Sequence, residues 1–349
     1  MIAATRTREG TAISYRHLAG LTDDRGLFEH ALHDRPRREH GYCLDDVARA
    51  LTVVVREPGP TELLDELTET YLRFVELSIA PDGLVRNRMD VTGTFTDTPA
   101  MGDWWGRAVA AVGFAARHAL GDDVRARARE AFTRLGAQRS TDVRTAATAA
   151  LGAADLLAVE PESPVARRVL TDALEVLPMK PVPGWHWPEE RLRYANASLP
   201  EAMIAGGDAL GDDALVDTGL GYLGFLLEAE SRDGHLSVTG TTGRGPGETG
   251  PFFDQQPIEV AGLADACARA YAMNGDPRWF EGVRRAWRWF EGENDVGIPM
   301  IDVATGAGFD GLEPDGRNEN RGAESTLAAL GTAQHARRLG ILRSEAVGE

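Results

Sequence analysis

Carboxylate, amide and aromatic side chains gather in six short clusters along the chain, and an alanine- and leucine-rich stretch follows each cluster. Pairs of carboxyl groups can supply the acid and the base or nucleophile that cleave a glycosidic bond, while amides and aromatic rings suit sugar hydroxyls and C–H faces. The clusters therefore predict a saccharide site wherever the fold brings them together. In chain order they are Asp45-Asp46, Asp103-Trp104-Trp105, Thr141-Asp142, Tyr194-Ala195-Asn196, Asp254-Gln255-Gln256 and Gly322-Ala323-Glu324.

Four acids in or near these clusters are the candidate catalytic groups. Asp46 follows Asp45 directly, so like-charge repulsion is expected to raise its pKa, as suits a general acid, although a helix N-cap explains the same position. Glu201, Glu259 and Glu324 fall in the first turns of apolar stretches, where the helix dipole stabilises a carboxylate by about 0.3 to 1 kcal/mol. Burying an unpaired acid costs several kcal/mol, which a water-filled sugar site would avoid. Which acid donates and which accepts a proton stays open.

The other polar and aromatic residues around the clusters are candidates for substrate binding. Asp45 lies four residues before Arg49, and Asp103 four before Arg107, so each pair is expected to form an ion pair on one helix face. The aromatic residues suit stacking against a sugar, with packing in the core as the alternative. The candidates are Tyr42, Asp45, Arg49, Asp103, Trp104, Trp105, Arg107, His186, Trp187, Glu189, Asn196, Gln255 and Gln256.

Neither a metal nor a cofactor is expected. The cysteine and histidine residues match no zinc spacing, and no GxGxxG sequence follows a strand. The glycine-rich segment 239–250 (TGTTGRGPGETG) contains Arg244 as its one basic residue and does not precede a strand-to-helix turn. We interpret this segment as a mobile loop over the pocket and not as a phosphate cradle.

The apolar stretches alternate with amphipathic ones such as 61–79, 122–137 and 276–293. A helix that is apolar nearly all round is buried, and an amphipathic helix covers it. The clusters start roughly 40 to 65 residues apart, which leaves room for a loop, a second helix and a turn. The pattern predicts an all-α (α/α)6 toroid of six helical hairpins, one domain over residues 1–349, with the clusters at one end of the inner ring.

Two details of this fold depend on weaker signals. The sixth outer helix has to come from the segment Ile13 to His33 or from outside the chain. Strand signals are sparse, and only 83–87 (GLVRN) and 234–238 (GHLSV) predict short β-hairpins in the loops.

The composition limits the partners and the compartment. The 349 residues include 54 acidic and 37 basic ones, for a formal net charge of -17. This charge disfavours nucleic acids and anionic membrane surfaces, because both require a positive field. Two cysteines are too few for a disulfide framework. No signal sequence or apolar run of membrane-spanning length is found, so a cytoplasmic protein is expected.

Several segments resemble a known family of helical domains that are fused to, or encoded beside, bacterial glycosyltransferases. They are 20–51 (GLTDDRGLFEHALHDRPRREHGYCLDDVARAL), 102–113 (GDWWGRAVAAVG), 185–203 (WHWPEERLRYANASLPEAM), 252–260 (FFDQQPIEV) and 320–330 (NRGAESTLAAL). Trp104-Trp105 departs from that pattern, in which smaller residues and histidine are expected. The resemblance implies a fold of the six-hairpin glycosidase type. No glycosyltransferase module is recognised beside it in this chain.

The residues and the resemblance together predict a cofactor-independent glycoside hydrolase that acts on an oligosaccharide or glycoside through two carboxylates. Inversion is favoured by analogy of fold. A non-catalytic glycan-binding module that assists a separate glycosyltransferase is the first alternative. The second is a sugar epimerase in which His186 would transfer the proton.

Overall fold

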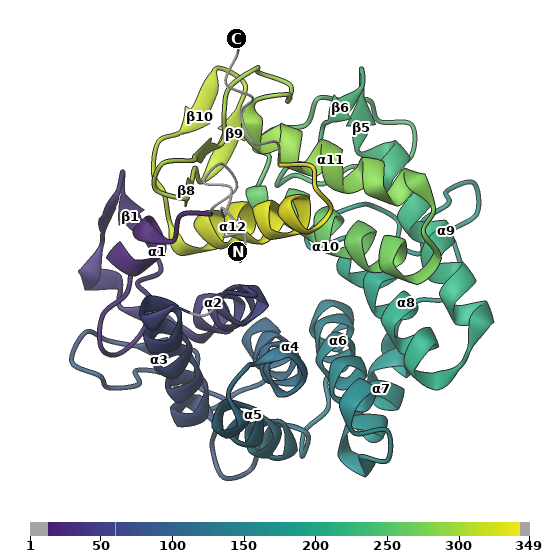
Figure 1. The fold of residues 1–349 in the computed structure, drawn as a ribbon. Helices are drawn as coiled ribbons and strands as arrows, with labels where there is room; N and C mark the ends of the chain where they lie inside the picture. Colours follow the sequence, from purple (N-terminus) through teal and green to yellow (C-terminus); the bar gives the residue numbers. More distant parts are fainter. Residues whose placement is uncertain (1–12, 60, 343–349) are drawn as a thin grey trace, which may run out of the picture.

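The computed structural model describes residues 13–59 and 61–342, and within them the helices form two concentric rings (Figure 1). The predicted (α/α)6 toroid is confirmed. The inner ring consists of α2 (Leu44–Arg56), α4 (Asp103–His118), α6 (Val143–Val159), α8 (Ser198–Leu210), α10 (Pro257–Asn274) and α12 (Ala323–Arg338). The outer helices are α3 (Glu62–Ser78), α5 (Asp122–Leu135), α7 (Pro164–Val176), α9 (Asp213–Ala229) and α11 (Pro277–Glu291).

The helix boundaries follow the local chemistry of the chain. The side chains of Asp142 and Asp212 accept hydrogen bonds from backbone amides in the first turns of α6 and α9, which satisfies donors that have no partner within the helix. The third polar cluster of the sequence therefore includes an N-cap, as the structural alternative for such residues requires. Left-handed glycines end three other helices, since glycine adopts this conformation without strain. They are Gly211, Gly275 and Gly292.

Burial explains why the two rings differ in composition. The inner helix α12 is buried on nearly every side, from Ala323 to Ala336. The outer helix α5 buries only Ala128, Ala131, Phe132 and Leu135, and its charged side chains are exposed or partly exposed. The alternation of apolar and amphipathic segments along the sequence is therefore an alternation between inner and outer positions.

Glycines let two inner helices approach closely. A Cβ atom added to Gly113 of α4 would collide with the backbone carbonyl of Gly152 in α6, and one added to Gly152 would collide with that of Val109. A Cβ at Gly106 would lie 2.6 Å from the carbonyl oxygen of Thr145. Helix α4 thus packs on α6 backbone to backbone, and this contact sets the width of the ring.

The ring closes where α12 meets α2. Nε2 of Gln334 donates a hydrogen bond to the backbone carbonyl of Val53 at 2.8 Å. At one end of this contact Arg49 lies 2.7 Å from Glu324, and at the other Arg337 lies 2.7 Å from Glu57. Polar contacts along the whole seam therefore join the first and the last inner helix.

The sixth outer position is filled differently from the other five. The segment Ile13 to His33 supplies one short helix, α1 (Arg16–Gly20), which lies beside α12 (Figure 1). His17 ties α1 to the chain around α12, because its amide donates to the carbonyl of Thr305 and its ring bonds to that of Arg321, both at 2.9 Å. The expected N-terminal origin is right, but the described residues hold no full-length helix there. Hairpins cover the rest of α12.

Small antiparallel hairpins form within the loops, as predicted. The segment 234–238 forms β6 within one of them, whereas 83–87 makes only isolated bridges at Val85 and precedes β4. The pairs are β1 (Ala31–Leu32) with β2 (Arg35–Pro36), β3 (Tyr42–Cys43) with β4 (Arg88–Met89), β5 (Ser231–Arg232) with β6 (His235–Leu236), β7 (Ile301–Asp302) with β8 (Ala307–Gly308), and β9 (Gly311–Glu313) with β10 (Gly316–Asn318). A short 3-10 helix, Arg38–His40, precedes β3.

The chain ends bear on two expectations. Residues 1–12 and 343–349 lie outside the described part, and the assignment of all 349 residues to one domain stays a prediction. No helix in the part that is described has both the length and the apolar character to cross a bilayer.

The close approach of α4 and α6 predicts opposite effects for two glycine substitutions. Gly113→Ala places a methyl group against the backbone of α6, and we expect the free energy of unfolding to fall by about 1 to 3 kcal/mol. Gly221→Ala lies in α9, where an added Cβ meets nothing within 4 Å, and helix propensity should raise stability by about 0.5 to 1 kcal/mol. Urea unfolding of both variants measures this. Equal effects of the two substitutions would contradict the backbone contact.

Candidate active site

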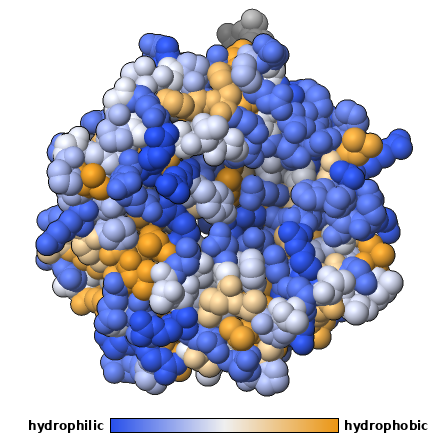
Figure 2. All heavy atoms as spheres, turned by 180° about the vertical axis from the view of Figure 1, so that it is seen from behind, coloured by the Kyte–Doolittle hydropathy of each residue, from blue (hydrophilic) through white to orange (hydrophobic). Residues whose placement is uncertain are grey.

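A cavity of about 210 Å3 lies on the axis of the toroid, and all six inner helices contribute to its wall. We call it the axial cavity. Much of the wall is formed by small side chains such as Ala48, Ala110 and Ala328. Seen from behind the view of Figure 1, the surface is hollowed at its centre and mainly hydrophilic around the hollow (Figure 2). The charged residues of the wall are Arg49, Arg56, Arg107, Asp155, Glu201, Glu259, Asp265 and Arg269.

Glu259 is a buried acid in the first turn of α10, with 5% of its surface exposed. Its Oε1 accepts a hydrogen bond from the amide of Ala195 at 2.6 Å, and its Oε2 accepts one from that of Asn196 at 3.3 Å. Burial raises the pKa of Glu259 to about 7 from its usual 4.5, and Glu324 adds to this, while the two hydrogen bonds and Arg144 oppose it. The Glu259 carboxyl group can therefore give up or accept a proton near neutral pH.

The turn that Glu259 binds is held in an unusual conformation. Ala195 has φ of 50°, in the left-handed region that costs a residue with a Cβ roughly 1–2 kcal/mol. The hydrogen bonds to Glu259 offset this cost. Asn196 fixes the same turn, because its side chain accepts from the amide of Arg193 at 2.9 Å and donates to the Arg193 carbonyl at 3.1 Å. Buried and fully engaged, Asn196 positions the turn in this structure.

Arg49 joins two of the candidate acids. Its guanidinium lies 2.6 Å from Asp46, on its own helix, and 2.7 Å from Glu324, on α12. The predicted pair of Asp45 with Arg49 is therefore wrong. Asp46 takes the place of Asp45, and the long arginine side chain reaches across the seam to a second acid.

Arg107 makes the equivalent bridge from α4. It lies 2.8 Å from Asp45 of α2 and donates a hydrogen bond to the hydroxyl of Tyr194. The predicted pair of Asp103 with Arg107 is wrong as well. Asp103 accepts a hydrogen bond from the hydroxyl of Thr145 at 3.0 Å, so it joins α4 to α6 and does not line the axial cavity.

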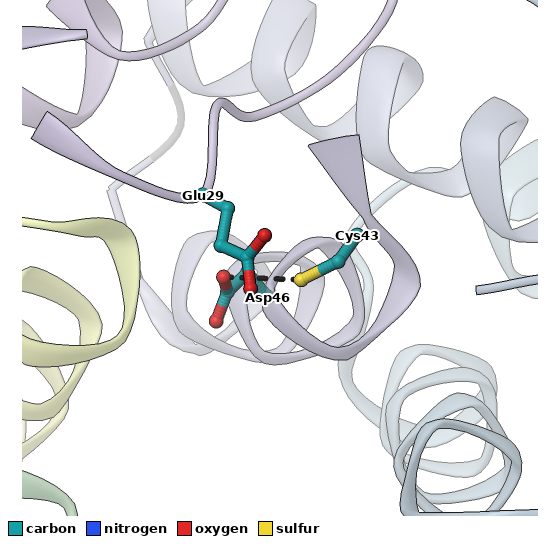
Figure 3. Close-up of side chains that lie close together, drawn as sticks. All are labelled: Glu29, Cys43 and Asp46. Atoms are coloured by element: carbon teal, nitrogen blue, oxygen red, sulfur yellow. Dashed lines mark hydrogen bonds between the residues drawn. The ribbon is translucent and has the colours of Figure 1, made fainter. Parts of the chain in front are cut away.

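Asp46 is buried away from the axial cavity, beneath Glu29 and Cys43 (Figure 3). The Cys43 thiol donates to Asp46 at 3.2 Å. Burial raises the pKa of Asp46 to about 7, although Arg49 opposes this shift. The expected direction is right, but its main cause is loss of solvent and not repulsion by Asp45. Without contact to the axial cavity, Asp46 cannot reach a ligand there in this conformation.

Glu29, Cys43 and Asp46 also form the one grouping in the described residues whose donor atoms lie close enough for a metal ion, within 4.8 Å of one another. Their chemistry does not favour one. Arg49 and Arg88 already neutralise the two carboxylates. Burial raises the pKa of the Cys43 thiol well above its usual value, whereas a metal binds the thiolate. We therefore assign no metal to this cluster.

Glu201 lies deeper along the axis, where the axial cavity meets a second cavity of about 620 Å3 at the C-terminal ends of the inner helices. We call this the C-terminal cavity. Arg269 lies 3.0 Å from Glu201, and burial raises the pKa of Glu201 to about 7 against the effect of this partner. Next to it, Arg56 lies 2.9 Å from Asp265. These two ion pairs form the boundary between the cavities.

On the opposite side of Glu259 lies a depression of about 470 Å3, which we call the outer depression. The glycine-rich segment forms one wall, through residues 239–243, and the turn before α8 forms another, through Arg193 and Tyr194. Gln256 also lines it. Glu259 is the residue whose surface borders both the outer depression and the axial cavity. The glycine-rich loop was expected over the axial pocket, but it lines the outer depression and not the axial cavity; its mobility stays a prediction.

Several aromatic candidates are core residues. Trp105 and Trp187 are buried among core side chains, and Gln255 is fully buried between Asp295 and Trp289. Tyr42 is also fully buried and donates its hydroxyl proton to Asp23 at 2.7 Å. None of these four has surface left for a ligand in this conformation. The alternative of core packing applies to them.

The remaining candidates divide into supporting and outlying residues. Glu189 forms a bidentate ion pair with Arg144. Arg144 also donates to the backbone carbonyl of Tyr194, so the pair supports the turn before α8. Trp104 is partly buried against the core and does not line the axial cavity. His186 is exposed near Phe225 of the outer helix α9 and lies outside both the axial cavity and the outer depression.

Sequence reasoning missed the charged residues in the middle and at the C-terminal ends of the inner helices. Asp155, Asp265 and Arg269 were visible as isolated charges within apolar stretches, and such charges must find a partner when they are buried. The predicted clusters all lie at helix starts and therefore did not include these three residues.

The burial of Glu259 predicts a pH dependence of stability. Between pH 4.5 and about 7 the folded state keeps the proton that the unfolded chain has released, so the contribution of this acid to stability is lost as the pH rises through that window. Relative to Glu259→Gln, the free energy of unfolding of the wild type should fall by up to about 3 kcal/mol between pH 4.5 and about 7. Urea unfolding at several pH values measures the difference, with Glu228→Gln on the exposed face of α9 as control. A constant difference would contradict the buried acid.

Comparison with protein-family models finds no match, and no curated protein matches the chain. Solved structures do share the fold. A sugar epimerase from a ruminal bacterium has a TM-score of 0.69 at 15% sequence identity, over 92% of this chain and 95% of that chain. Cellobiose 2-epimerase from Bacillus thermoamylovorans has a TM-score of 0.68 at 12% identity, over 93% and 96%.

A hydrolase of the same architecture is also similar. The cellulase of C. cellulolyticium in complex with cellobiose has a TM-score of 0.63 at 11% identity, over 90% of this chain and 88% of that chain. A D-mannose isomerase matches with a TM-score of 0.67 at 10% identity. At such identities the likeness shows the fold alone. The chain has the six-hairpin, glycosidase-like (α/α)6 fold that sugar epimerases, isomerases and endoglucanases share.

Proposed function

We propose that this protein is a carbohydrate-active enzyme in which Glu259 transfers a proton to or from a bound saccharide. The observation that carries the proposal is the position of Glu259, a buried acid between the axial cavity and the outer depression. A group that exchanges its proton near the working pH is the most effective general acid or base. The sugar-acting enzymes among the similar folds support the substrate class by analogy.

Hydrolysis of a glycosidic bond is the reaction we favour. The described residues that line the axial cavity and the outer depression include no histidine, so carboxyl groups have to perform the chemistry there. Glu259 would protonate the leaving oxygen. Glu324 lines neither space in this conformation, but it is ion-paired with Arg49 of the axial wall, 37% of its side chain is exposed, and its charge raises the pKa of Glu259. We propose it as the carboxylate that activates a water molecule. Such a pair requires no cofactor.

A sugar epimerase or isomerase is the second candidate. His186 does not support it, because this residue lies away from the cavities. The C-terminal cavity does, since His118 and His335 both line it and burial lowers the pKa of each imidazole, which favours the neutral, basic form. His335 is held by Asp265 at 2.6 Å. A histidine pair of this kind could move a proton on a sugar carbon.

We expect Glu259→Gln to reduce the turnover of an oligosaccharide substrate by about 100-fold or more, as loss of a general acid does. Saccharide affinity should stay within about tenfold, or 1.4 kcal/mol. In the wild type, turnover should decline as the pH rises above about 7, because the protonated form of Glu259 is lost. Release of reducing ends from a panel of neutral oligosaccharides measures this, and Glu228→Gln is the matched control.

A second assay, run beside the oligosaccharide panel, separates the hydrolase from the alternatives. Incubation with free hexoses in heavy water reports an epimerase through carbon-bound deuterium, which should disappear in His335→Gln if the C-terminal cavity is the site. Deuterium incorporation without release of reducing ends would overturn the hydrolase assignment. Saccharide binding without either reaction would indicate a glycan-binding module, whose association with a glycosyltransferase stays a prediction.

A further inference from the structure

We propose that the outer depression is a subsite for an anionic group, a carboxylate or a phosphate, on the sugar unit that lies outside Glu259. The inference rests on the proposed saccharide function and extends it to the substrate class. The outer depression is more than twice the size of the axial cavity, at about 470 against 210 Å3. Because Glu259 borders both spaces, a saccharide bound across it would place one unit in the axial cavity and another in the outer depression.

Arg193 gives the outer depression an uncompensated positive charge. This exposed side chain lines the depression and forms no ion pair with any acid in residues 13–59 and 61–342. Its backbone is fixed by two hydrogen bonds with the Asn196 side chain, which accepts from the Arg193 amide and donates to the Arg193 carbonyl. Its Cγ lies 3.8 Å from the position of a Cβ on Gly243. The guanidinium is thus carried on a rigid turn and presented to the depression, as an anion-binding arginine has to be.

The neighbouring Arg191, unlike Arg193, is ion-paired with an acid. Arg191 forms two parallel hydrogen bonds with Glu248, at 2.8 and 2.9 Å, and Glu248 also accepts from the amide of Gly245. This pair fastens the glycine-rich segment to the turn before α8. It neutralises Glu248, the nearest exposed acid of that loop, and leaves the charge of Arg193 to a ligand.

The rest of the lining does not oppose an anion. Glu259 is the one acid among the described residues that border the outer depression, and it is buried with both oxygens engaged. The N-terminus of α10 also faces the depression, since its N-cap residue Gln256 lines it and makes no capping hydrogen bond. The positive end of the helix dipole favours an anion there. The chain has a formal net charge of -17, so this positively charged site differs in sign from the net charge of the protein.

The chemistry of the ligand follows from the guanidinium. Arginine binds the planar carboxylate and the phosphate oxygens through paired N–H donors, and a neutral hydroxyl gains much less from it. The hydroxyls of Thr241 and Thr242, on the facing loop, suit the remaining sugar hydroxyls. We therefore assign to the outer depression a uronic acid or a phosphorylated sugar in preference to a neutral unit.

Calorimetric titration tests the subsite with four probes: cellobiose, glucuronic acid, glucose 6-phosphate and inorganic phosphate. We expect Arg193→Gln to weaken binding of the charged sugars about tenfold or more and to leave cellobiose within about twofold. Raising the salt concentration should weaken only the charged probes. Arg35→Gln, which removes the same charge from the exposed strand β2, is the matched control and should change nothing.

The outcomes of this titration distinguish failure of the anionic subsite from failure of the saccharide function. Equal affinity of the wild type for neutral and charged sugars, or an unchanged preference in Arg193→Gln, would overturn the anionic subsite even if oligosaccharides are still turned over. Binding of inorganic phosphate that depends on Arg193, without binding of any sugar, would keep the anion site and reject the saccharide function. Preference between glucuronic acid and glucose 6-phosphate identifies the group.

Discussion

The closure of six parallel inner helices into a narrow ring is the constraint on which the rest of the structure depends. Helix α4 can meet α6 only because Gly113 and Gly152 bring the two backbones together. The seam between α2 and α12 closes through Arg49 and Gln334, which join side chain to side chain and side chain to backbone. A narrow ring leaves a small axial cavity and buries, wholly or in part, the polar side chains of its wall. Both consequences shape the site.

The hydrogen-bond partners of the buried candidate acids divide these acids into two groups. Asp46 and Glu201 keep an arginine partner at hydrogen-bond distance, so their charge is compensated even though burial raises their pKa values. Glu259 has backbone amides and no arginine at hydrogen-bond distance. Burial raises the pKa of all three acids to about 7, so the pKa does not distinguish them. Glu259 differs in having no arginine partner and in bordering both the axial cavity and the outer depression, and for this reason we propose it as the proton-transfer group.

The fold was accessible from the sequence because its signal is local and repeated. Each inner helix is apolar on most sides and each outer helix on one, and the polar clusters mark the inner N-termini. The pairings were not accessible, because both arginines bind an acid of a neighbouring helix, Arg49 binding Glu324 and Arg107 binding Asp45. Spacing along one helix does not indicate such partners. Adjacency to a cluster also could not tell Trp105 and Trp187, which are core residues, from residues that face the cavity. That distinction depends on rotation about the helix or loop axis, which spacing alone does not fix.

The proposed role of Glu259 depends most directly on the titration of its carboxyl group. A 13C NMR titration of the glutamate side-chain carboxyl signals, with Glu259→Gln used to assign the resonance, measures it. We expect the Glu259 signal to titrate near pH 7 and its midpoint to move when a saccharide is added, since the ligand displaces water beside it. A midpoint near the usual 4.5 that does not respond to any saccharide would contradict the assignment of Glu259 as the proton-transfer group.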